Sequence, residues 1–377
     1  MTASFIYTEK MQEYDYGGGH PLKMIRLKLT HELLMAYGVF SNDGVEFVET
    51  MPASRKSVES VHSREYIDVL KDVDKGILPE DPSRYGLGCG DNPAFKGVYA
   101  GSMLSTGASL QAAELVTSGK TEAAFNIAGG LHHAMPGRAS GFCYINDPAV
   151  AINYLVGKGL RVAYIDIDAH HGDGVQKIFY ETDRVLTISL HEDGHYLFPG
   201  TGPPEESGSG GGRGYSVNLP LLPGTGDDVF SWGFFELVPP LIEAYRPDII
   251  VTQLGCDSFA TDPLAHLNVT TNGFTKMVEW FKKSNIPWLG MGGGGYDVAN
   301  VARAWSLAFS IMAGISLPDE LPASYVSLLK ENGLSGRLLR DEPLHLSAKD
   351  LKVQRAGAEK MLSIIRKNIF PIHGIRS

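Results

Sequence analysis

Residues 161–173 read RVAYIDIDAHHGD and carry the clearest indication of the fold. The first half of this stretch is a short apolar run without alternation, which is typical of a strand buried on both faces of a parallel sheet. Residues 185–192 (VLTISLHE) and 248–256 (DIIVTQLGC) have the same character. Helical patterns lie between and around these runs, at about 93–118, 148–157, 228–244, 272–283 and 298–313. This alternation predicts an α/β fold with a central, mainly parallel sheet flanked by helices.

The composition is that of an acidic globular protein. The chain has 377 residues, of which 33 are Lys or Arg and 43 are Asp or Glu, so the formal net charge is −10. Without a basic run, nucleic acid and anionic membranes are not expected ligands. No repeat or linker divides the chain, so we expect one domain over residues 1–377. Its motifs lie within about 5–314, and about 318–377 is expected to close the domain with helices.

The cysteines and the N-terminus indicate a reducing compartment. Cys89, Cys143 and Cys256 form no CxxC pair, so neither a disulfide framework nor a thiolate zinc cluster is expected. Charges at positions 9, 10 and 13 interrupt any signal-peptide core, and the longest apolar stretch, 304–318, is too short to cross a membrane. We therefore expect a cytoplasmic protein.

Polar residues follow the predicted strands at the edge where parallel sheets collect ligands. Asp168 and His170 follow the first run, and Asp257 follows the third. One imidazole and two carboxylates form a three-ligand set that leaves one position open, as in a catalytic zinc site. The alternative for a single residue such as Asp168 is a helix cap.

Two further strand ends carry groups suited to proton transfer. His132 and His133 follow a Gly-Gly turn, and Asp166 and Asp173 are spare carboxylates able to orient an imidazole as a general base. Tyr296 follows four glycines, 292–295, and a protonated phenol there is able to donate to an oxyanion, although a plain turn is the alternative. The Gly-rich stretch 207–214 lacks a phosphate-binding pattern and is predicted to be a surface loop.

Seven ordered motifs give the chain a resemblance to a known family over about residues 5–314. They are HPLKMIRL (20–27), GLHHAM (130–135), SGFCYINDP (140–148), YIDIDAHHGDGVQK (164–177), FPGTGP (198–203), LGCDSFATDPLA (254–265) and GGGGYDVANVARAWS (292–306). Together they resemble the histone deacetylase family, in particular its class I-like bacterial branch of acetoin-utilisation deacetylases. Cys256 and Leu131 depart from residues common in the family, without removing a functional group.

The resemblance implies a single domain of the arginase/deacetylase fold, with one catalytic Zn²⁺ at the foot of a narrow tunnel. Zinc would be bound by Asp168, His170 and Asp257. His132 and His133 would flank the attacking water, paired with Asp166 and Asp173, with His133 as the base and Tyr296 bonded to the acetyl carbonyl. Substrate contacts are implied at the tunnel wall (Gly141, Phe142, Phe198, Leu264), at Gly294, and at the rim carboxylate Asp91.

The family also binds monovalent cations, usually K⁺, and the resemblance implies up to two such sites. The first would use Asp166, Asp168, His170, Ser189 and Leu190. The second would use Phe179, Thr182, Val185 and Tyr215. A cation beside Asp166 would alter the basicity of the neighbouring histidine.

The expected activity is zinc-dependent hydrolysis of acetyl-lysine in proteins, with acetylpolyamines or other small acylated amines as alternative substrates. A di-manganese ureohydrolase on the same fold is disfavoured, because Gly172 and Phe259 stand where ligands for a second metal are needed. A third possibility is a reader that binds acyl-lysine without hydrolysing it. The sequence does not indicate the substrate, the acyl length or the oligomeric state.

Overall fold

The computed structural model describes residues 2–88 and 90–376. Its centre is an eight-stranded sheet in the order β2-β1-β3-β8-β7-β4-β5-β6, and every neighbouring pair is parallel. The prediction of an α/β fold with a parallel sheet is confirmed. The strands are β1 Ala3–Tyr7, β2 Val45–Glu49, β3 Ala123–Asn126, β4 Val162–Asp166, β5 Val185–Glu192, β6 Ser216–Leu221, β7 Ile249–Gln253 and β8 Trp288–Met291.

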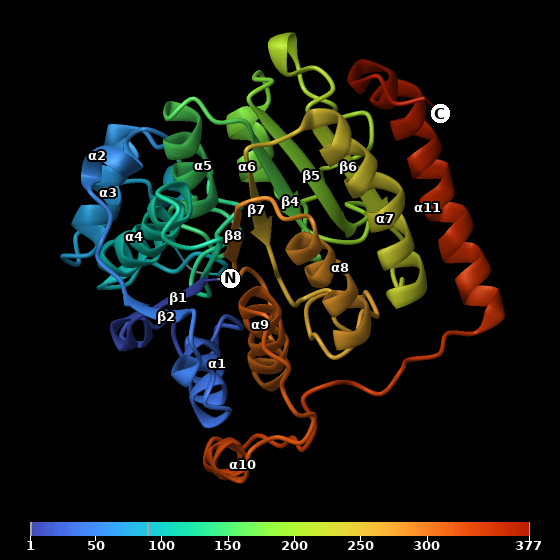
Figure 1. Cartoon of the computed structure of the whole chain (residues 1–377). Coiled ribbons are helices and arrows are strands. Elements are labelled where there is room, and N and C mark those ends of the chain that lie inside the picture. The colour runs from blue at the N-terminus through green and yellow to red at the C-terminus, as the bar shows by residue number, and fades with distance from the viewer. Residues whose placement is uncertain (1, 89, 377) are drawn as a thin grey trace.

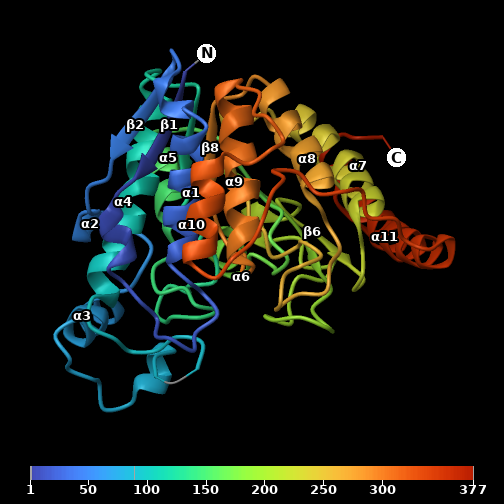
Figure 2. The same ribbon diagram turned by 90° about the horizontal axis from the view of Figure 1, so that it is seen from below.

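Helices cover both faces of the sheet (Figures 1 and 2). One layer contains α1, α7, α8, α9 and α11, which contact one another in series, and α10 packs on α1; the other contains α2 to α6. The helices are α1 Ile25–Ala36, α2 Arg55–Val58, α3 Arg64–Val73, α4 Val98–Thr117, α5 Asp147–Gly157, α6 Asp173–Phe179, α7 Asp227–Tyr245, α8 Thr271–Lys283, α9 Val298–Ala313, α10 Ala323–Glu331 and α11 Ala348–Asn368.

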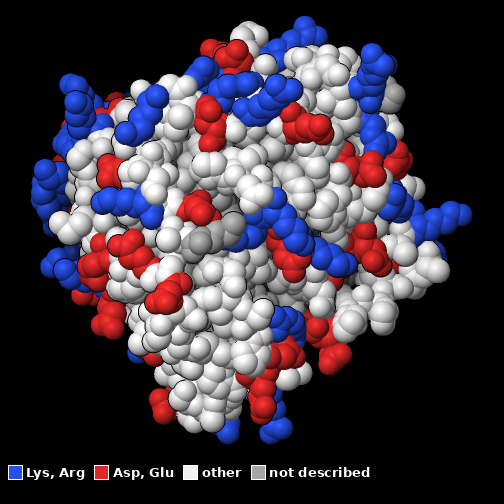
Figure 3. All heavy atoms as spheres, in the orientation of Figure 1, with Lys and Arg blue, Asp and Glu red and all other residues white. Residues whose placement is uncertain are grey.

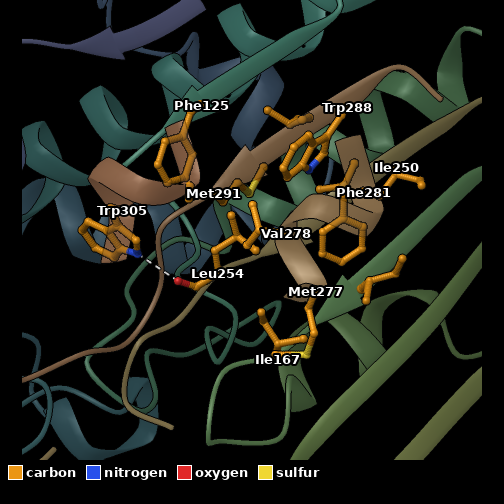
Figure 4. Packing of buried hydrophobic residues seen from close by; sticks show 14 of the residues in the cluster. Phe125, Ile167, Ile250, Leu254, Met277, Val278, Phe281, Trp288, Met291 and Trp305 are labelled. Atoms are coloured by element: carbon orange, nitrogen blue, oxygen red, sulfur yellow. Dashed lines mark hydrogen bonds between the residues drawn. The ribbon is translucent and has the colours of Figure 1, made fainter. Parts of the chain in front are cut away.

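The core holds the central strands rigidly, because both faces of the sheet are covered. All residues of β4, β5, β7 and β8 are buried. Figure 4 shows large rings packed around β8, where the Trp305 indole N–H donates to the carbonyl of Leu254 over 2.8 Å. Phe125 meets Trp305 edge to face at 6.5 Å between ring centroids. The ends of these strands therefore start from fixed positions.

Element boundaries differ from the sequence-based expectations at two places that matter. Helix α4 begins at Val98 rather than near 93, because Gly97 has φ +96° and so cannot continue a right-handed helix. Strand β4 ends at Asp166, because its Oδ1 accepts the backbone N–H of Asp168 over 3.1 Å and bends the chain. Beyond Asp166 the chain leaves the regular strand, and helix α6 begins at Asp173.

The surface charge is mixed (Figure 3), and the two described cysteines are free thiols. The face in Figure 3 carries both Lys/Arg and Asp/Glu side chains, interspersed. Within the described residues, no helix is both long and apolar enough to span a bilayer. Cys143 and Cys256 are buried free thiols, and Cys89 lies outside the described residues.

Candidate active site

Four neighbouring strands bring the predicted site residues to one edge of the sheet. The order β3-β8-β7-β4 places the segments that follow these strands side by side. The histidine pair follows β3, the glycine quartet follows β8, Asp257 follows β7, and Asp168 with His170 follows β4. Since all four strands are parallel, their carboxyl ends share one edge, where α/β proteins place their ligands.

Asp168, His170 and Asp257 form a buried cluster. One ligand atom from each residue lies within 4.8 Å of the others. His170 Nδ1 is 2.9 Å from Asp257 Oδ2 and 3.1 Å from Asp168 Oδ1. In the described part of the chain, this is the one group of three or more His, Cys, Asp or Glu side chains with such spacing.

The cluster fits a divalent metal ion. One imidazole nitrogen and two carboxylates suit zinc, and three protein ligands leave a position for substrate or water. Burial and the nearby Asp168 carboxylate raise the pKa of Asp257 to about 7, so two adjacent buried carboxylates call for a cation. Backbone amides orient both carboxylates: Ala169 N donates to Asp257 Oδ1 over 2.7 Å and Gly294 N to Asp168 Oδ2 over 2.8 Å.

His132 and His133 each bond a carboxylate through Nδ1. The partners are Asp166 Oδ2 and Asp173 Oδ1, both at 2.7 Å. The two Nε2 atoms lie 2.9 Å apart, so one of them carries a proton and the other accepts it. Asp166 also accepts from the Tyr164 hydroxyl over 2.8 Å, which fixes the carboxylate behind His132.

The surrounding charges shift the pKa values of the two imidazoles in opposite directions. Burial disfavours the charged form of His132, but the carboxylates of Asp166 and Asp168 more than offset it and raise its pKa to about 9. Burial and the adjacent His132 charge lower the pKa of His133 to about 4, against the opposing effect of Asp173. At neutral pH His133 is therefore the neutral member and has the Nε2 lone pair.

Tyr296 follows the glycine quartet and lines the same cavity as the histidine pair. Burial and the Asp257 and Asp168 carboxylates raise the pKa of Tyr296 well above its ordinary value, so its hydroxyl remains a donor. The buried Arg26 holds the glycine loop before Tyr296: its Nη1 donates to the carbonyls of Gly293 (2.8 Å) and Gly295 (3.1 Å). The Arg26 guanidinium lies 5.0 Å from the centroid of the Trp305 ring.

A narrow cavity of about 20 Å³, open to solvent on one side, joins these groups. It is lined by His132, His133, Asp168, His170 and Tyr296, together with Leu22, Arg26, Gly130, Leu131, Gly141, Phe142, Cys143, Gly293 and Gly294. A second cavity of about 40 Å³ adjoins it and shares the lining residues Leu22, Arg26 and Leu131.

Some of the predicted substrate-contact residues lie at this cavity. Gly141 and Phe142 line it, and the Phe142 ring meets Tyr296 at 5.6 Å between centroids. Phe198 packs against His133 at 5.0 Å and is 42% exposed, so it stands between the site and solvent. A Cβ on Gly141 would lie 2.5 Å from the His133 ring and 2.8 Å from Phe198, which explains a glycine there.

Leu264 and Asp91 do not line the cavity. The backbone N–H of Leu264 donates to Asp262 Oδ1 over 2.9 Å, on the loop after β7. Asp91 is exposed, and its carbonyl accepts from His20 Nε2 over 3.1 Å, because the His20 Nδ1 already accepts the N–H of Leu22. Their substrate contacts remain predictions.

The residues of both predicted cation sites gather in two places. Asp166 pairs with Ser189 across β4 and β5, beside Leu190 and just before Asp168 and His170. Phe179 and Thr182 are joined in the turn after α6 by a 3.3 Å backbone bond, and Val185 follows at the start of β5. The carbonyl of Tyr215 accepts Thr187 N there over 2.9 Å.

Several positioning residues have no role in the sequence-based account. The Asn146 amide donates to the carbonyls of His132 and Ala134, both at 3.0 Å, and so fixes the backbone around the pair. Gln253 Nε2 donates to the Gly130 carbonyl over 2.8 Å and to Asp168 Oδ2 over 3.2 Å. Asn146 lies inside the motif at 140–148, and Gln253 directly precedes the motif at 254–265. This closeness to the motifs is the one sequence signal that could have pointed to their roles.

The fold and the site define an α/β protein with a candidate metal centre at the carboxyl edge of its sheet. A family model described as histone deacetylase domain matches residues 20–312, so the chain belongs to the histone deacetylase family. It is 42% identical over 330 residues to the acetoin utilization protein AcuC of Bacillus subtilis, covering 85% of each chain.

Two further relatives extend the comparison. The chain is 40% identical over 321 residues to the histone deacetylase HDAC1 of Drosophila melanogaster, covering 84% of this chain but 61% of that longer protein. A crystal structure of an HDAC homologue from Aquifex aeolicus superposes with a TM-score of 0.86 at 33% identity, covering 95% of this chain and all of that one. The family resemblance and the predicted fold are confirmed.

Proposed function

We propose that the chain is a zinc-dependent deacetylase that removes acetyl groups from the ε-amine of acetyl-lysine in proteins. One observation carries the proposal: Asp168 and His170 of the buried Asp-His-Asp cluster line the same cavity as the carboxylate-paired His133 and as Tyr296. These are the parts that metal-assisted hydrolysis of an amide needs, namely a Lewis-acid site, a base and an oxyanion donor. Membership of the histone deacetylase family supports it.

Zinc would be held by Asp168, His170 and Asp257. A bound Zn²⁺ would polarise the amide carbonyl and lower the pKa of a water molecule towards about 7. The chain supplies the rest of the site: backbone amides of Ala169 and Gly294 keep the two carboxylates in place.

Proton transfer falls to the histidine pair. When the 2.9 Å bond between the two Nε2 atoms opens, the neutral His133 takes the proton of the attacking water at Nε2. Asp173 stabilises the resulting imidazolium through the 2.7 Å bond to Nδ1. His132, already held in the charged form by Asp166, contributes a fixed positive charge. Tyr296 donates its hydroxyl to the carbonyl oxygen as negative charge develops, and the leaving amine takes its proton from the imidazolium.

The cavity walls favour an aliphatic stem ending in a small acyl group. Phe142 and Phe198 offer apolar ring surface, and Gly141 keeps the wall between them free of a side chain. We assign Gly294 and Leu264 to the same passage, and the exposed Asp91 to the backbone amides of a peptide substrate. A peptide-bound acetyl-lysine uses all of these contacts, whereas an acetylpolyamine has no backbone amide for Asp91.

Potassium would occupy one or two sites behind the catalytic groups. The first lies around Asp166, Asp168, His170, Ser189 and Leu190, next to the carboxylate that charges His132. The second lies around Phe179, Thr182, Val185 and Tyr215. A cation at the first site would weaken the pull of Asp166 on His132, so we expect K⁺ to change the rate rather than the zinc content.

The test is a kinetic panel on zinc-loaded protein at fixed K⁺. Acetyl-lysine peptides, longer acyl-lysine peptides and acetylpolyamines are compared by release of the free acid. We expect the highest kcat/KM for the acetyl-lysine peptide and a rise in KM for that peptide in Asp91→Asn, with the acetylpolyamine unaffected. Preference for the polyamine would overturn the substrate assignment, and no release from any amide would support a reader.

A further inference from the structure

We propose that Asp262 is a positioning residue, which orients the Tyr296 hydroxyl by holding the Tyr296 backbone. The inference rests on the deacetylase function proposed above. Asp262 is 8% exposed and belongs to the loop after β7. Its Oδ2 accepts the backbone N–H of Tyr296 over 2.8 Å, and its Oδ1 accepts that of Leu264 over 2.9 Å. One carboxylate thus joins the loop after β7 to the loop after β8.

Tyr296 needs such an anchor because the segment before it has little conformational preference of its own. Four glycines precede it, and two of them, Gly293 and Gly295, have φ of +117° and +133°. Other contacts hold the glycines themselves: Arg26 binds the carbonyls of Gly293 and Gly295, and Cys256 N binds that of Gly294 over 2.8 Å. The Asp262 bond is the contact that fixes the backbone of Tyr296 directly.

The anchor is itself fixed. Asp262 N donates to the carbonyl of Phe259 over 3.0 Å, and Phe259 pairs with Val269 at the base of the loop. Both oxygens of Asp262 face amide donors, so a carboxylate fits and an amide does not. An asparagine keeps one acceptor, and its NH₂ group meets the second N–H donor to donor.

The substitutions Asp262→Asn and Asp262→Ala test the assignment, with Asp297→Asn as the matched control. Asp297 is the next residue after Tyr296, but its carboxylate caps helix α9 through Asn300 N, a role that asparagine also performs. Because misplacing a catalytic group by about 1 Å costs on the order of 100-fold, we expect kcat to fall roughly tenfold in Asp262→Asn and about 100-fold in Asp262→Ala. KM and bound zinc stay at wild-type values, and Asp297→Asn keeps the wild-type kcat.

A double-mutant cycle separates positioning from general damage. If Asp262 acts through the Tyr296 hydroxyl, Asp262→Asn has no further effect on kcat in the Tyr296→Phe background. Hydrogen exchange on metal-free protein gives a readout without activity: exchange of the Tyr296 amide accelerates in Asp262→Ala, while that of β7 and β8 is unchanged. The proposal is overturned if the kcat loss persists in the Tyr296→Phe background, or if the Tyr296 amide keeps its protection. Inactive wild-type protein would instead refute the proposed function.

Discussion

Substitution of Gly294 by alanine should empty the metal site without unfolding the protein. A Cβ built on Gly294 lies 1.9 Å from Asp257 Oδ2 and 2.8 Å from Asp168 Oδ2, so it meets both proposed carboxylate ligands. Since real Cβ atoms essentially never lie closer than 3.0 Å to a neighbour, Asp257 or the loop must move by at least about 1.1 Å. Backbone strain is not involved, because Gly294 has no positive φ.

This movement exceeds what a metal site tolerates, which is about 0.2 Å in the ligand distances. We expect the zinc affinity to fall by about 10–100-fold, as it does when the contacts that orient the ligands are lost. Overpacking should lower the free energy of unfolding of the metal-free protein by about 1–3 kcal/mol. Competition with a chromophoric chelator measures the affinity, and urea unfolding of the metal-free protein measures the stability.

The matched control is Gly157→Ala at the end of α5, where a Cβ meets nothing within 4 Å. It should keep the wild-type zinc affinity and gain about 0.5–1 kcal/mol, since alanine loses less conformational entropy than glycine in a helix. Wild-type zinc affinity in Gly294→Ala would refute the placement of the metal between Asp168 and Asp257.

Three other predictions concern the catalytic groups, the ring at the tunnel wall and a buried histidine outside the site. His133→Asn and Tyr296→Phe should each lower kcat by about 10²–10⁴-fold with zinc content unchanged, because they remove the base and the oxyanion donor; near-normal turnover in either variant would refute that role. Phe198→Ala should raise KM for an acetyl-lysine peptide about tenfold through lost apolar contact, and an unchanged KM would remove Phe198 from the substrate path. Burial lowers the pKa of His62 from 6.5 to about 4. The neutral imidazole therefore contributes about 3 kcal/mol to the free energy of unfolding above pH 6.5, and this contribution is lost as the pH falls to 4. Urea unfolding at pH 7 and pH 4 should therefore show a smaller acid loss in His62→Gln than in wild type, and equal losses would contradict the argument.

The site was predictable from sequence where its groups are local to a strand end. Asp168 and His170 are separated by one residue, and His132 and His133 are adjacent, so their spacing alone suggests shared chemistry. Apolar runs also indicated β4, β5 and β7, since strands buried on both faces leave a continuous pattern. In contrast, β2 and helix α1 were not predicted, because no residue of β2 is buried and α1 has no marked apolar face.

The residues that orient the site were missed for a different reason. Gln253 contacts Gly130 across 123 positions, and Asp262 contacts Tyr296 across 34. Such roles arise only when the strand order brings distant loops together, so no local sequence spacing predicts them. The ends of β4 and α4 could not be predicted from the sequence either. A side-chain acceptor at Asp166 and a positive φ at Gly97 determine where these elements end and begin.

In the proposed function, one metal ion in the Asp168-His170-Asp257 cluster drives amide hydrolysis. Its most direct test is a titration of metal-free protein with Zn²⁺, following acetate release from an acetyl-lysine peptide. We predict that the rate rises linearly and stops at one equivalent of zinc per chain, and that Asp257→Asn shows no rise over the same range. A zinc-saturated wild-type protein that releases no acetate, or a rate that rises up to two equivalents, would contradict the claim.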